Sequence, residues 1–530
     1  MKRGAQRPTP PKRIVRAQLL AFAICLGFCL MAVRAAHFAL AGLGAEAEAG
    51  MAAPAPMRAD LADRNGLLLA ASVPTYAVQI ERARQWDARE TAEGLRRALP
   101  MLDAATLARR LKGNKGLAVV ARRLTPVQRD AVFALGLPGL TLVEEPARFY
   151  PHRQTGAPLL GQINAAQEGV AGLERVFNAR LRQETAPVRV SLDLRLQHAL
   201  EAEIEAARRA SGAQYGAGVL LDGRTGEVLA LASLPSFDAN RQPAPDSPLR
   251  EHRALSAVYE YGSVLKPFTV AMALEAGLTS PAERFDLKSV QAGARTLVDP
   301  HPLPGGTGDL ADILAQSSNV GAAILALRLG EPRQTAGLRA LGLAEGTPIA
   351  VAEAGAPVFP AASDPGTIAS RGYGHGISVS LLALARAYTV FVNGGEMVSL
   401  RLTPFVEGEE IARTRVYGAA TAEAVREYLR AVVARGTGRL ADLQEVAVAG
   451  KTGTGEKYGA GGYDPGRNVA SFAAVLPAER PRYVLLTALD EPRAGTGGAL
   501  AAPLTARIVA RIAPMLDIAP PAAIAPASAP

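Results

Sequence analysis

The segment Gly262–Lys266 places a turn directly before an apolar stretch of chain, and this junction constrains how the chain can fold. The apolar run that follows predicts a buried helix (Phe268, Val270, Ala271, Ala273 and Leu274). Gly277 is a suitable residue to end that helix. Ser263 therefore lies where a turn enters a helix that the rest of the fold must cover.

Ser263 and Lys266 are three residues apart, so in a helical first turn they share one face and their polar atoms can meet. A serine hydroxyl becomes a nucleophile when a nearby base takes its proton, and an amine can do so when burial or a cationic neighbour lowers its pKa. The pair alone also fits an N-cap serine followed by a solvated lysine. Only eight of the 58 basic residues are lysine, however, and arginine cannot lose its proton. This usage favours a chemical role for Lys266.

Two further motifs follow along the chain. Ser317 and Asn319 form an S-x-N motif, and Lys451–Gly453 form a K-T-G motif at the end of a predicted strand. S-x-x-K, S-x-N and K-T-G in this order resemble the active-site set of the penicillin-binding proteins and serine β-lactamases. Each triplet alone is common, whereas all three in order across one domain are a specific signal.

The net charge of +9 is concentrated at the N-terminus. Residues 1–16 contain six basic residues and no acidic residue, whereas later arginines are scattered among acids. This distribution is typical of a cytoplasmic positive-inside signal and argues against nucleic-acid binding. A nucleotide-binding loop at Lys451 is excluded as well, because the first glycine of that pattern would fall at Glu445.

Residues 17–33 form a stretch without charge. Its length is close to the about 20 residues that a membrane-spanning helix needs. We predict an uncleaved transmembrane helix over residues 17–38, with residues 1–16 in the cytoplasm and the rest of the chain outside it. The alternative is a signal peptide cleaved near Ala39–Ala41.

Cysteine and histidine usage limits the chemistry of the exported part. Both cysteines, Cys25 and Cys29, fall in the predicted membrane helix, so no disulfide is expected. The six histidines are dispersed without a metal-binding spacing. We therefore expect no metal and no other cofactor.

The region around the motifs predicts strands alternating with helices. A helix is expected over residues 194–207 and another over 504–512, and the strands are expected at 188–193, 217–221, 227–231, 446–451, 469–476 and 483–489. Such an order implies an antiparallel sheet layered between helices, which is an α+β fold. Nearer the N-terminus we expect two strands, at 66–70 and 76–80, and short helices at 88–99 and 126–135.

From the membrane helix to about residue 514, the chain resembles the class B penicillin-binding proteins, and most closely the septal, division-type peptidoglycan D,D-transpeptidases. The resemblance includes Arg58–Gly66, Arg148–Pro151 and Gly172–Phe177. It departs from the usual pattern at Tyr261, where proline commonly precedes Gly-Ser, and at Gly455, where alanine is common.

This resemblance implies a penicillin-binding and serine β-lactamase-like transpeptidase domain on an elongated N-terminal pedestal, the dimerisation domain. Its expected domains are a cytoplasmic tail, a transmembrane helix, a linker, a pedestal, a transpeptidase domain and a disordered Ala/Pro tail (1–16, 17–38, 39–57, 58–187, 188–514 and 515–530).

The resemblance also implies roles for the motif residues. Ser263 would attack the penultimate D-Ala carbonyl of a stem peptide, and Lys266 would take its proton, although which group is the acylation base is disputed across this superfamily. Ser317 would relay a proton to the leaving amine. Asn319 would hydrogen-bond Lys266 and the substrate amide, and Lys451 would supply positive charge.

Substrate binding is implied for Thr452, Gly453 and Thr454, with the two threonines at the terminal carboxylate of the peptide. The backbone N–H groups of Ser263 and Thr454 would form an oxyanion hole. The segment Gly372–Gly376 resembles a glycine-rich stretch that lines the site, and we expect its histidine to be a lining residue rather than a base.

The implied partners are peptidoglycan stem peptides, the lipid-linked precursor polymer, β-lactam antibiotics, the inner membrane, an SEDS-type glycosyltransferase and other divisome proteins, with no nucleic acid. An elongation-type class B transpeptidase and a D,D-carboxypeptidase remain open as alternatives. A β-lactamase would need neither an anchor nor a pedestal. A non-catalytic divisome scaffold is disfavoured by the intact Ser263, Lys266 and Lys451.

Overall fold

The computed structural model describes most of the chain between residues 21 and 518. The described residues are 21–34, 36, 57–113, 115–346, 349, 351, 353–361, 364–459 and 462–518. The predicted basic tail, all of the predicted linker except Met57, and residues 519–530 of the predicted tail lie outside them. Met515 and Leu516, at the start of that predicted tail, belong to a 3₁₀ helix, η8 (Ala513–Leu516).

An apolar helix occupies Ala21–Arg34, within the segment predicted to span a membrane. Its side chains, those of Cys25 and Cys29 included, are almost all exposed. Ala21–Arg34 is shorter than a membrane span, and among the described residues one helical stretch, Gly497–Leu516, has the length and composition of one. That stretch is 44% buried in the protein, and Leu504, Ile508 and Ile512 pack in the core, so it is a core helix.

The chain divides into two compact units, which are described separately: residues 74–147 together with the N-terminal residues to Met57, and residues 58–73 together with those from Arg148 onward. In the first unit, segments of three strands and three helices enclose a small core around Ile80, Leu95 and Val120. The helices are α2 (Ala88–Ala98), α3 (Ala104–Leu111) and α4 (Pro126–Phe133), and the strands include β3 (Leu117–Leu124) and β4 (Leu140–Phe149).

The first two predicted strands form one long strand, β2 (Leu68–Glu81), which corrects the expectation of two. Pro74 lies in the interval between the two predicted strands. Proline has no N–H to donate, but Pro74 lies between the stretch of β2 that pairs with β1 (Leu61–Ala62) and the stretch that pairs with β3. The strand therefore passes through the proline without losing a bond in either ladder.

The second unit is built on a five-stranded antiparallel sheet in the order β18-β19-β20-β8-β9. Its strands are β8 (Tyr215–Asp222), β9 (Val228–Leu234), β18 (Ala449–Gly459), β19 (Gly462–Leu476) and β20 (Tyr483–Asp490). All of them pair antiparallel, as predicted. The strand order makes β18 an edge strand, with one side open to other parts of the fold.

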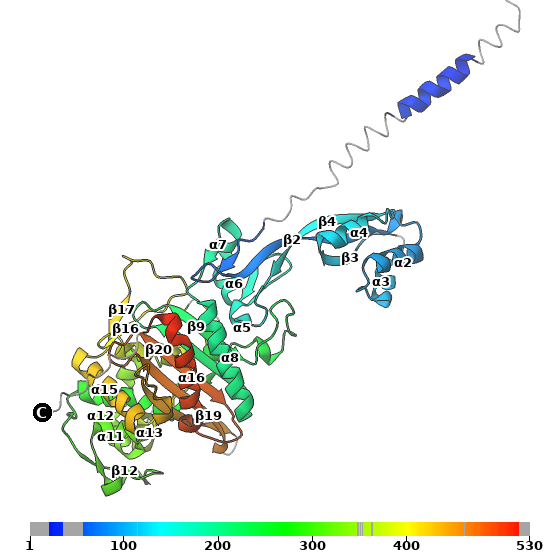
Figure 1. Ribbon diagram of the computed structural model, residues 1–530. Helices are drawn as coiled ribbons and strands as arrows, with labels where there is room; N and C mark the ends of the chain where they lie inside the picture. Colours follow the sequence, from blue (N-terminus) through cyan, green and yellow to red (C-terminus); the bar gives the residue numbers. More distant parts are fainter. Residues whose placement is uncertain are drawn as a thin grey trace, which may run out of the picture. The chain divides into compact units, whose positions relative to one another are not determined.

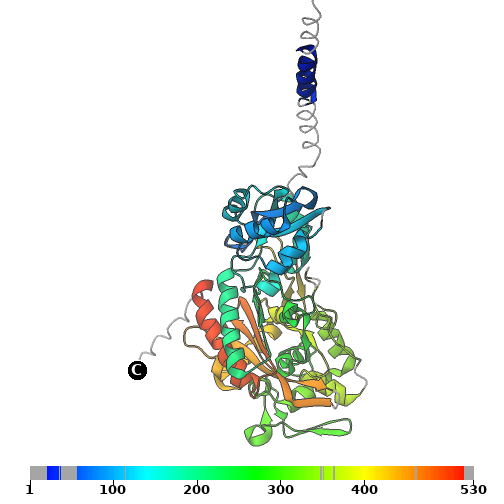
Figure 2. The ribbon, with the colours of Figure 1, turned by 90° about the vertical axis from the view of Figure 1, so that its right-hand side faces the viewer.

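Helices cover both faces of this sheet. On one face, α8 (Leu194–Ser211) and α16 (Ala502–Ile512) lie side by side (Figure 2), and Leu200, Phe472 and Ile508 share a core there. The other face packs against a larger core that includes α10 (Lys266–Glu275), α12 (Asn319–Ala340) and α14 (Leu381–Tyr388). The predicted layering of a sheet between helices is confirmed (Figure 1).

Two predicted strands have different limits in the structure. The strand expected over residues 188–193 is reduced to β7 (Val188–Arg189), because Asp193 caps α8 by accepting from the N–H groups of Arg195 and Leu196. The K-T-G motif was expected at the end of a strand, but β18 begins at Ala449 and continues to Gly459. The motif therefore lies early in a long edge strand.

Candidate active site

The serine segment is a short 3₁₀ turn, η3 (Gly262–Leu265), that leads directly into α10. As predicted, α10 is buried, and Gly277, at φ +65°, follows its end. Gly262 has φ +57°, and a Cβ there would lie 2.5 Å from the Thr454 carbonyl oxygen. This position therefore requires glycine for two reasons, its backbone conformation and the close approach of η3 to β18.

Gly455, one of the two departures from the usual family pattern, lies in the same contact. A Cβ at Gly455 would be 1.6 Å from the carbonyl oxygen of Glu260, which is less than any real contact distance. The segment before Ser263 is thus packed directly on the β18 backbone. In this chain alanine at position 455 would push the serine turn away from the strand.

The S-x-N motif lies between α11 (Leu310–Ala315) and α12. Ser317 has a left-handed backbone conformation, with φ +60°, and Ser318 caps α12 by accepting from the N–H of Gly321 at 2.9 Å. The buried Asp299 accepts from the Ser318 hydroxyl and from the Asn319 N–H at 2.6 Å. Asp299 therefore holds the motif in place. The sequence contained no signal for this residue, which is 18 positions before Ser317.

The three motifs meet at the hydroxyl of Ser317. Lys451 Nζ lies 2.9 Å from Ser317 Oγ, and Lys266 Nζ lies 3.1 Å from the same oxygen. Lys266 Nζ also donates to Asn319 Oδ1 at 2.7 Å and to the Ser317 carbonyl. Lys451 Nζ further donates to the Thr452 carbonyl at 3.1 Å. Both lysine side chains are fully buried.

Burial lowers the pKa of Lys266 to about 7, because the charged form loses its hydration, and the nearby carboxylate of Asp299 opposes the shift. Burial also lowers the pKa of Lys451 well below its usual value, and the positive charge of Lys266 adds to that effect. Near neutral pH the site therefore holds an amine that can exist without its proton, which is the property a base at Ser263 needs.

Ser263 lines a cavity of about 710 Å³ together with Ser317, Asn319, Thr452 and Thr454. The direct contact expected between Ser263 and Lys266 is absent from the hydrogen bonds of the described part of the chain. The ammonium of Lys266 is directed instead to Ser317 and Asn319. Carbonyl and amide oxygens are stronger hydrogen-bond acceptors than the hydroxyl of Ser263. With these acceptors, fewer protons of the buried ammonium remain unpaired.

The geometry of β18 bears on the expected oxyanion hole. The Thr454 carbonyl oxygen faces Gly262, because a Cβ added at Gly262 would lie 2.5 Å from that oxygen. In an extended strand the N–H and C=O of one residue point to the same side. The Thr454 N–H is therefore directed out of the sheet edge toward the serine turn, where a donor to a developing oxyanion is needed.

The two threonines of the motif are held by neighbouring segments. The Thr452 hydroxyl oxygen lies 2.8 Å from that of Thr437, and Thr454 Oγ1 accepts from the N–H of Gly497 at 3.1 Å. Thr437 also lines the cavity. It belongs to the Gly436–Gly438 segment, and no sequence motif indicated its contact with Thr452. The expected carboxylate-binding hydroxyls thus face the cavity with their orientation restrained.

His375 lies close to the site without joining its hydrogen bonds. Its ring contacts Tyr373 and Tyr463, with centroids 5.4 and 5.2 Å apart. Burial and the positive charge of Lys266 lower the pKa of His375, which favours the neutral imidazole. His375 is thus not placed as a base, and it is not among the residues that line the 710 Å³ cavity, so the expected lining role is not seen there.

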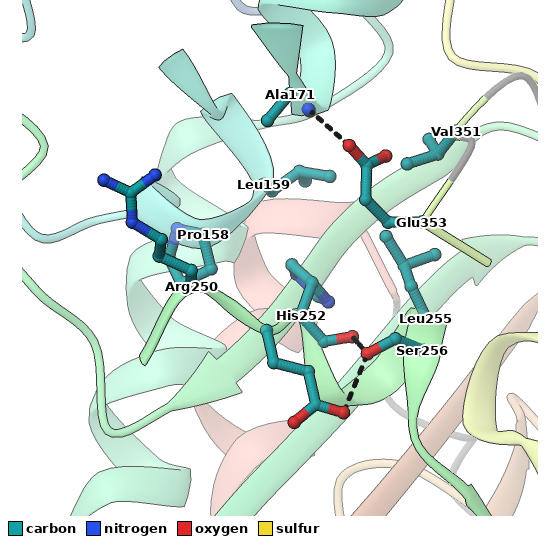
Figure 3. Close-up of a pocket in the computed structure, with 11 residues that line it drawn as sticks. Pro158, Leu159, Ala171, Arg250, His252, Leu255, Ser256, Val351 and Glu353 are labelled. Carbon is teal, nitrogen blue, oxygen red and sulfur yellow. Dashed lines mark hydrogen bonds between the residues drawn. The ribbon is translucent and has the colours of Figure 1, made fainter. Parts of the chain in front are cut away.

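A second cavity, of about 200 Å³, contains a serine and a histidine but not the geometry of a catalytic pair (Figure 3). The Ser256 hydroxyl donates to Glu251 Oε1 at 3.1 Å and approaches the His252 carbonyl oxygen at 3.2 Å rather than the imidazole. The imidazole Nε2 lies 3.2 Å from the Leu231 carbonyl oxygen, and burial lowers the pKa of His252 to about 4. The cavity at Ser263 is therefore the candidate active site.

Comparison with known proteins agrees with this geometry. Residues 216–510 match the family of the penicillin binding protein transpeptidase domain, and residues 53–195 match the penicillin-binding protein dimerisation domain. The probable peptidoglycan D,D-transpeptidase FtsI of Caulobacter vibrioides is 37% identical, over 97% of this chain and 91% of that protein. The peptidoglycan D,D-transpeptidase FtsI of Escherichia coli is 29% identical, over 88% and 84%.

The fold is similar to that of penicillin binding protein 3 from Mycobacterium tuberculosis, solved in complex with aztreonam. The TM-score is 0.69 and the identity 26%, with 88% of this chain and 98% of that chain covered. Two family matches in the expected order and a relative similar along nearly its full length agree with the serine and lysine motifs. The chain belongs to the penicillin-binding protein transpeptidase family, as a class B member of the FtsI type.

Proposed function

We propose that this chain is a septal peptidoglycan D,D-transpeptidase in which Ser263 is the acylated residue. The observation that carries the proposal is the Ser317 hydroxyl, 2.9 and 3.1 Å from two buried lysines in a cavity that Ser263 lines. A serine that faces a substrate-sized cavity beside a neutral amine has what nucleophilic catalysis requires.

In the acylation step, Ser263 Oγ forms a bond to the penultimate D-Ala carbonyl carbon while its proton passes to the free amine of Lys266. The lowered pKa of Lys266 makes that amine available near neutral pH. The N–H groups of Ser263 and Thr454 stabilise the oxyanion, and loss of one such donor costs roughly 3–4 kcal/mol of transition-state stabilisation.

The tetrahedral intermediate then collapses. The peptide C–N bond breaks and the terminal D-Ala leaves as an amine, which takes the proton through the Ser317 hydroxyl. Ser317 is suited to this relay because its oxygen contacts both lysines. In the second half-reaction the neutral amine of a neighbouring stem peptide attacks the acyl carbonyl and gives one proton to the free amine of Lys266. The bond to Ser263 Oγ then breaks, and Lys266 passes that proton to the serine.

Substrate orientation is assigned to the remaining motif residues. Asn319 holds Lys266 at 2.7 Å and offers its amide to the peptide backbone of the donor. Lys451 adds positive charge to the site. Thr452 and Thr454 bind the terminal carboxylate. Gly453 lies between them in the cavity lining, where a Cβ would be 2.4 Å from the Tyr261 carbonyl oxygen. A β-lactam would acylate the same serine.

The wider organisation is part of the same proposal. Residues 17–38 anchor the protein in the inner membrane with residues 1–16 in the cytoplasm, residues 58–187 form a pedestal, and residues 188–514 form the extracytoplasmic transpeptidase domain. The glycan strands would come from a separate SEDS-type polymerase within the divisome, acting on the lipid-linked precursor.

The test is incubation of the full chain with a fluorescent penicillin, followed by mass spectrometry of the labelled peptide. We expect a long-lived adduct on Ser263 that is absent in Ser263→Ala. An adduct that hydrolyses within seconds, or one on another residue, would contradict the proposal. Division with Ser263→Ala as the only copy would favour a scaffold instead.

A further inference from the structure

Glu260 is a half-buried carboxylate three residues before Ser263, and the chemistry above gives it no role. Its Oε1 accepts from the Gly376 N–H at 3.0 Å, and its Oε2 accepts from the Tyr463 hydroxyl at 2.9 Å. Within the described ranges, no lysine or arginine forms an ion pair with it. Burial raises the pKa of Glu260, as expected for a carboxylate without a cationic partner.

Aromatic rings continue from this carboxylate. The ring centroid of Tyr463 lies 5.2 Å from that of His375 and 5.3 Å from that of Tyr458. Tyr458 and Tyr463 are 75% and 41% exposed, so these rings can still be reached from solvent. A carboxylate beside aromatic rings is a combination that attracts organic cations, because the ring faces carry negative electrostatic potential.

This cluster is attached to the serine turn. A Cβ at Gly374 would lie 2.0 Å from the Gly262 carbonyl oxygen, so the segment carrying His375 packs directly against the residue before Ser263. The charge of Lys266 is close enough to lower the pKa of His375. Glu260, His375 and Tyr463 therefore adjoin the catalytic serine.

Two groups of residues adjoin Ser263, and their charges differ in sign: those of the 710 Å³ cavity, and Glu260 with its aromatic rings. Arg435, Arg439 and one carboxylate, Asp299, line the 710 Å³ cavity, and the two buried lysines adjoin it. Basic groups therefore outnumber acidic ones there, which favours the carboxylate groups of a donor peptide. Glu260 and its rings lie among residues that do not line the cavity and present negative potential. The reaction needs a second substrate of opposite charge, because the acceptor is an amine and an aliphatic amine is protonated at neutral pH.

We infer that Glu260, Tyr463 and His375 form a subsite that recognises the ammonium group of the acceptor stem peptide. The inference rests on the proposed function and extends it to the second substrate. Glu260 acts here by positioning: its carboxylate binds the ammonium, and the rings of Tyr463 and His375 pack against the chain that carries it. The ammonium releases one proton to solvent before the free amine attacks the acyl ester, and Glu260 forms no covalent bond. The Tyr463 hydroxyl and Gly376 N–H fix the carboxylate before the acceptor arrives.

The test separates the two half-reactions of the full-length protein. A thioester analogue of the donor peptide acylates Ser263, and the tetrapeptide L-Ala-γ-D-Glu-L-Lys-D-Ala is the acceptor. For Glu260→Gln we expect at least a tenfold rise in the acceptor concentration that gives half-maximal aminolysis. The rate of thioester acylation should change less than about twofold, because the glutamine oxygen can still accept from the Gly376 N–H and its NH2 group can donate to the Tyr463 hydroxyl oxygen.

Hydroxylamine, which is uncharged at mildly alkaline pH, is the second acceptor, and its reaction should be insensitive to Glu260→Gln. Tyr463→Ala should raise the half-maximal peptide concentration as well, whereas Glu407→Gln, on the surface, should not. Equal losses with the peptide and hydroxylamine, or no change with either, would overturn the subsite. Failure of the wild-type protein to react with the thioester or a penicillin would overturn the proposed function instead.

Discussion

The Nζ atom of Lys451 lies 2.9 Å from the hydroxyl oxygen of Ser317, on a segment 134 residues away in sequence. The same oxygen is 3.1 Å from Lys266 Nζ, so one hydroxyl connects two buried amines. Both amines have lowered pKa values because they are out of water, and the positive charge of Lys266 lowers the pKa of Lys451 further. The Ser317 hydroxyl is therefore placed to pass a proton from one group to the other.

Removal of that shared hydroxyl should slow acylation. For Ser317→Ala we expect the rate of reaction with fluorescent penicillin to fall about 10²–10³-fold, within the range for loss of a proton-transfer group. The adduct should still form on Ser263. Ser289→Ala, at an exposed position, is the matched control and should react as the wild type does. An unchanged rate in Ser317→Ala would exclude the relay.

The lowered pKa of Lys266 predicts a pH dependence. Its free amine is the active form, so the acylation rate should rise with pH, through a midpoint near the value of about 7, and then level off. An ordinary lysine would place this midpoint more than three units higher, at about 10.4. Stopped-flow acylation over a range of pH gives the profile. A rate that falls as pH rises through neutrality would mean that the protonated lysine is the active form.

A buried ion network should determine stability without affecting chemistry. Glu174 is fully buried and accepts from Arg58 Nε and from Arg148 Nε, each at 2.7 Å. Glu174→Gln leaves two buried guanidinium groups without a counter-charge, so we expect a loss of about 3–5 kcal/mol in the free energy of unfolding.

Denaturant unfolding measures the loss, and penicillin acylation of the folded variant should stay near the wild-type rate. The control is Glu184→Gln, which removes an exposed pair with Arg180 and should cost less than about 1 kcal/mol. Equal destabilisation by the two variants would contradict the importance of burial.

The packing of the serine turn on β18 gives a test of geometry. In Gly455→Ala the new Cβ would lie 1.6 Å from the Glu260 carbonyl oxygen, so the turn must move away from the strand. Because Ser263 and Thr454 then no longer share one oxyanion site, we expect acylation to slow by at least tenfold.

Gly277→Ala is the comparison for this variant, since a Cβ there meets no atom within 4 Å. It should cost about 1 kcal/mol of stability for the left-handed backbone and leave the acylation rate unchanged. A normal rate in Gly455→Ala would show that the turn and strand adjust independently.

Much of the fold followed from local patterns. The helix after Ser263 was predicted from its apolar run, and the antiparallel strands from alternating or continuous apolar segments, because burial leaves a periodic trace in sequence. The residues at which strands begin and end were less predictable. The strands predicted at 66–70 and 76–80 are one continuous strand, β2, and Asp193 shortened a predicted strand by capping α8.

The order of S-x-x-K, S-x-N and K-T-G indicated the chemistry from sequence alone, since these residue types at these spacings are rarely combined by chance. Other parts of the site left no such trace. Asp299, Glu260 and Tyr463 belong to no motif, and only folding brings Asp299 to the N-terminus of α12 and Tyr463 to the Glu260 carboxylate. Local spacing determines which face a side chain shares with its neighbours, whereas the partners, burial and pKa of a charged group depend on segments that only the tertiary structure brings together.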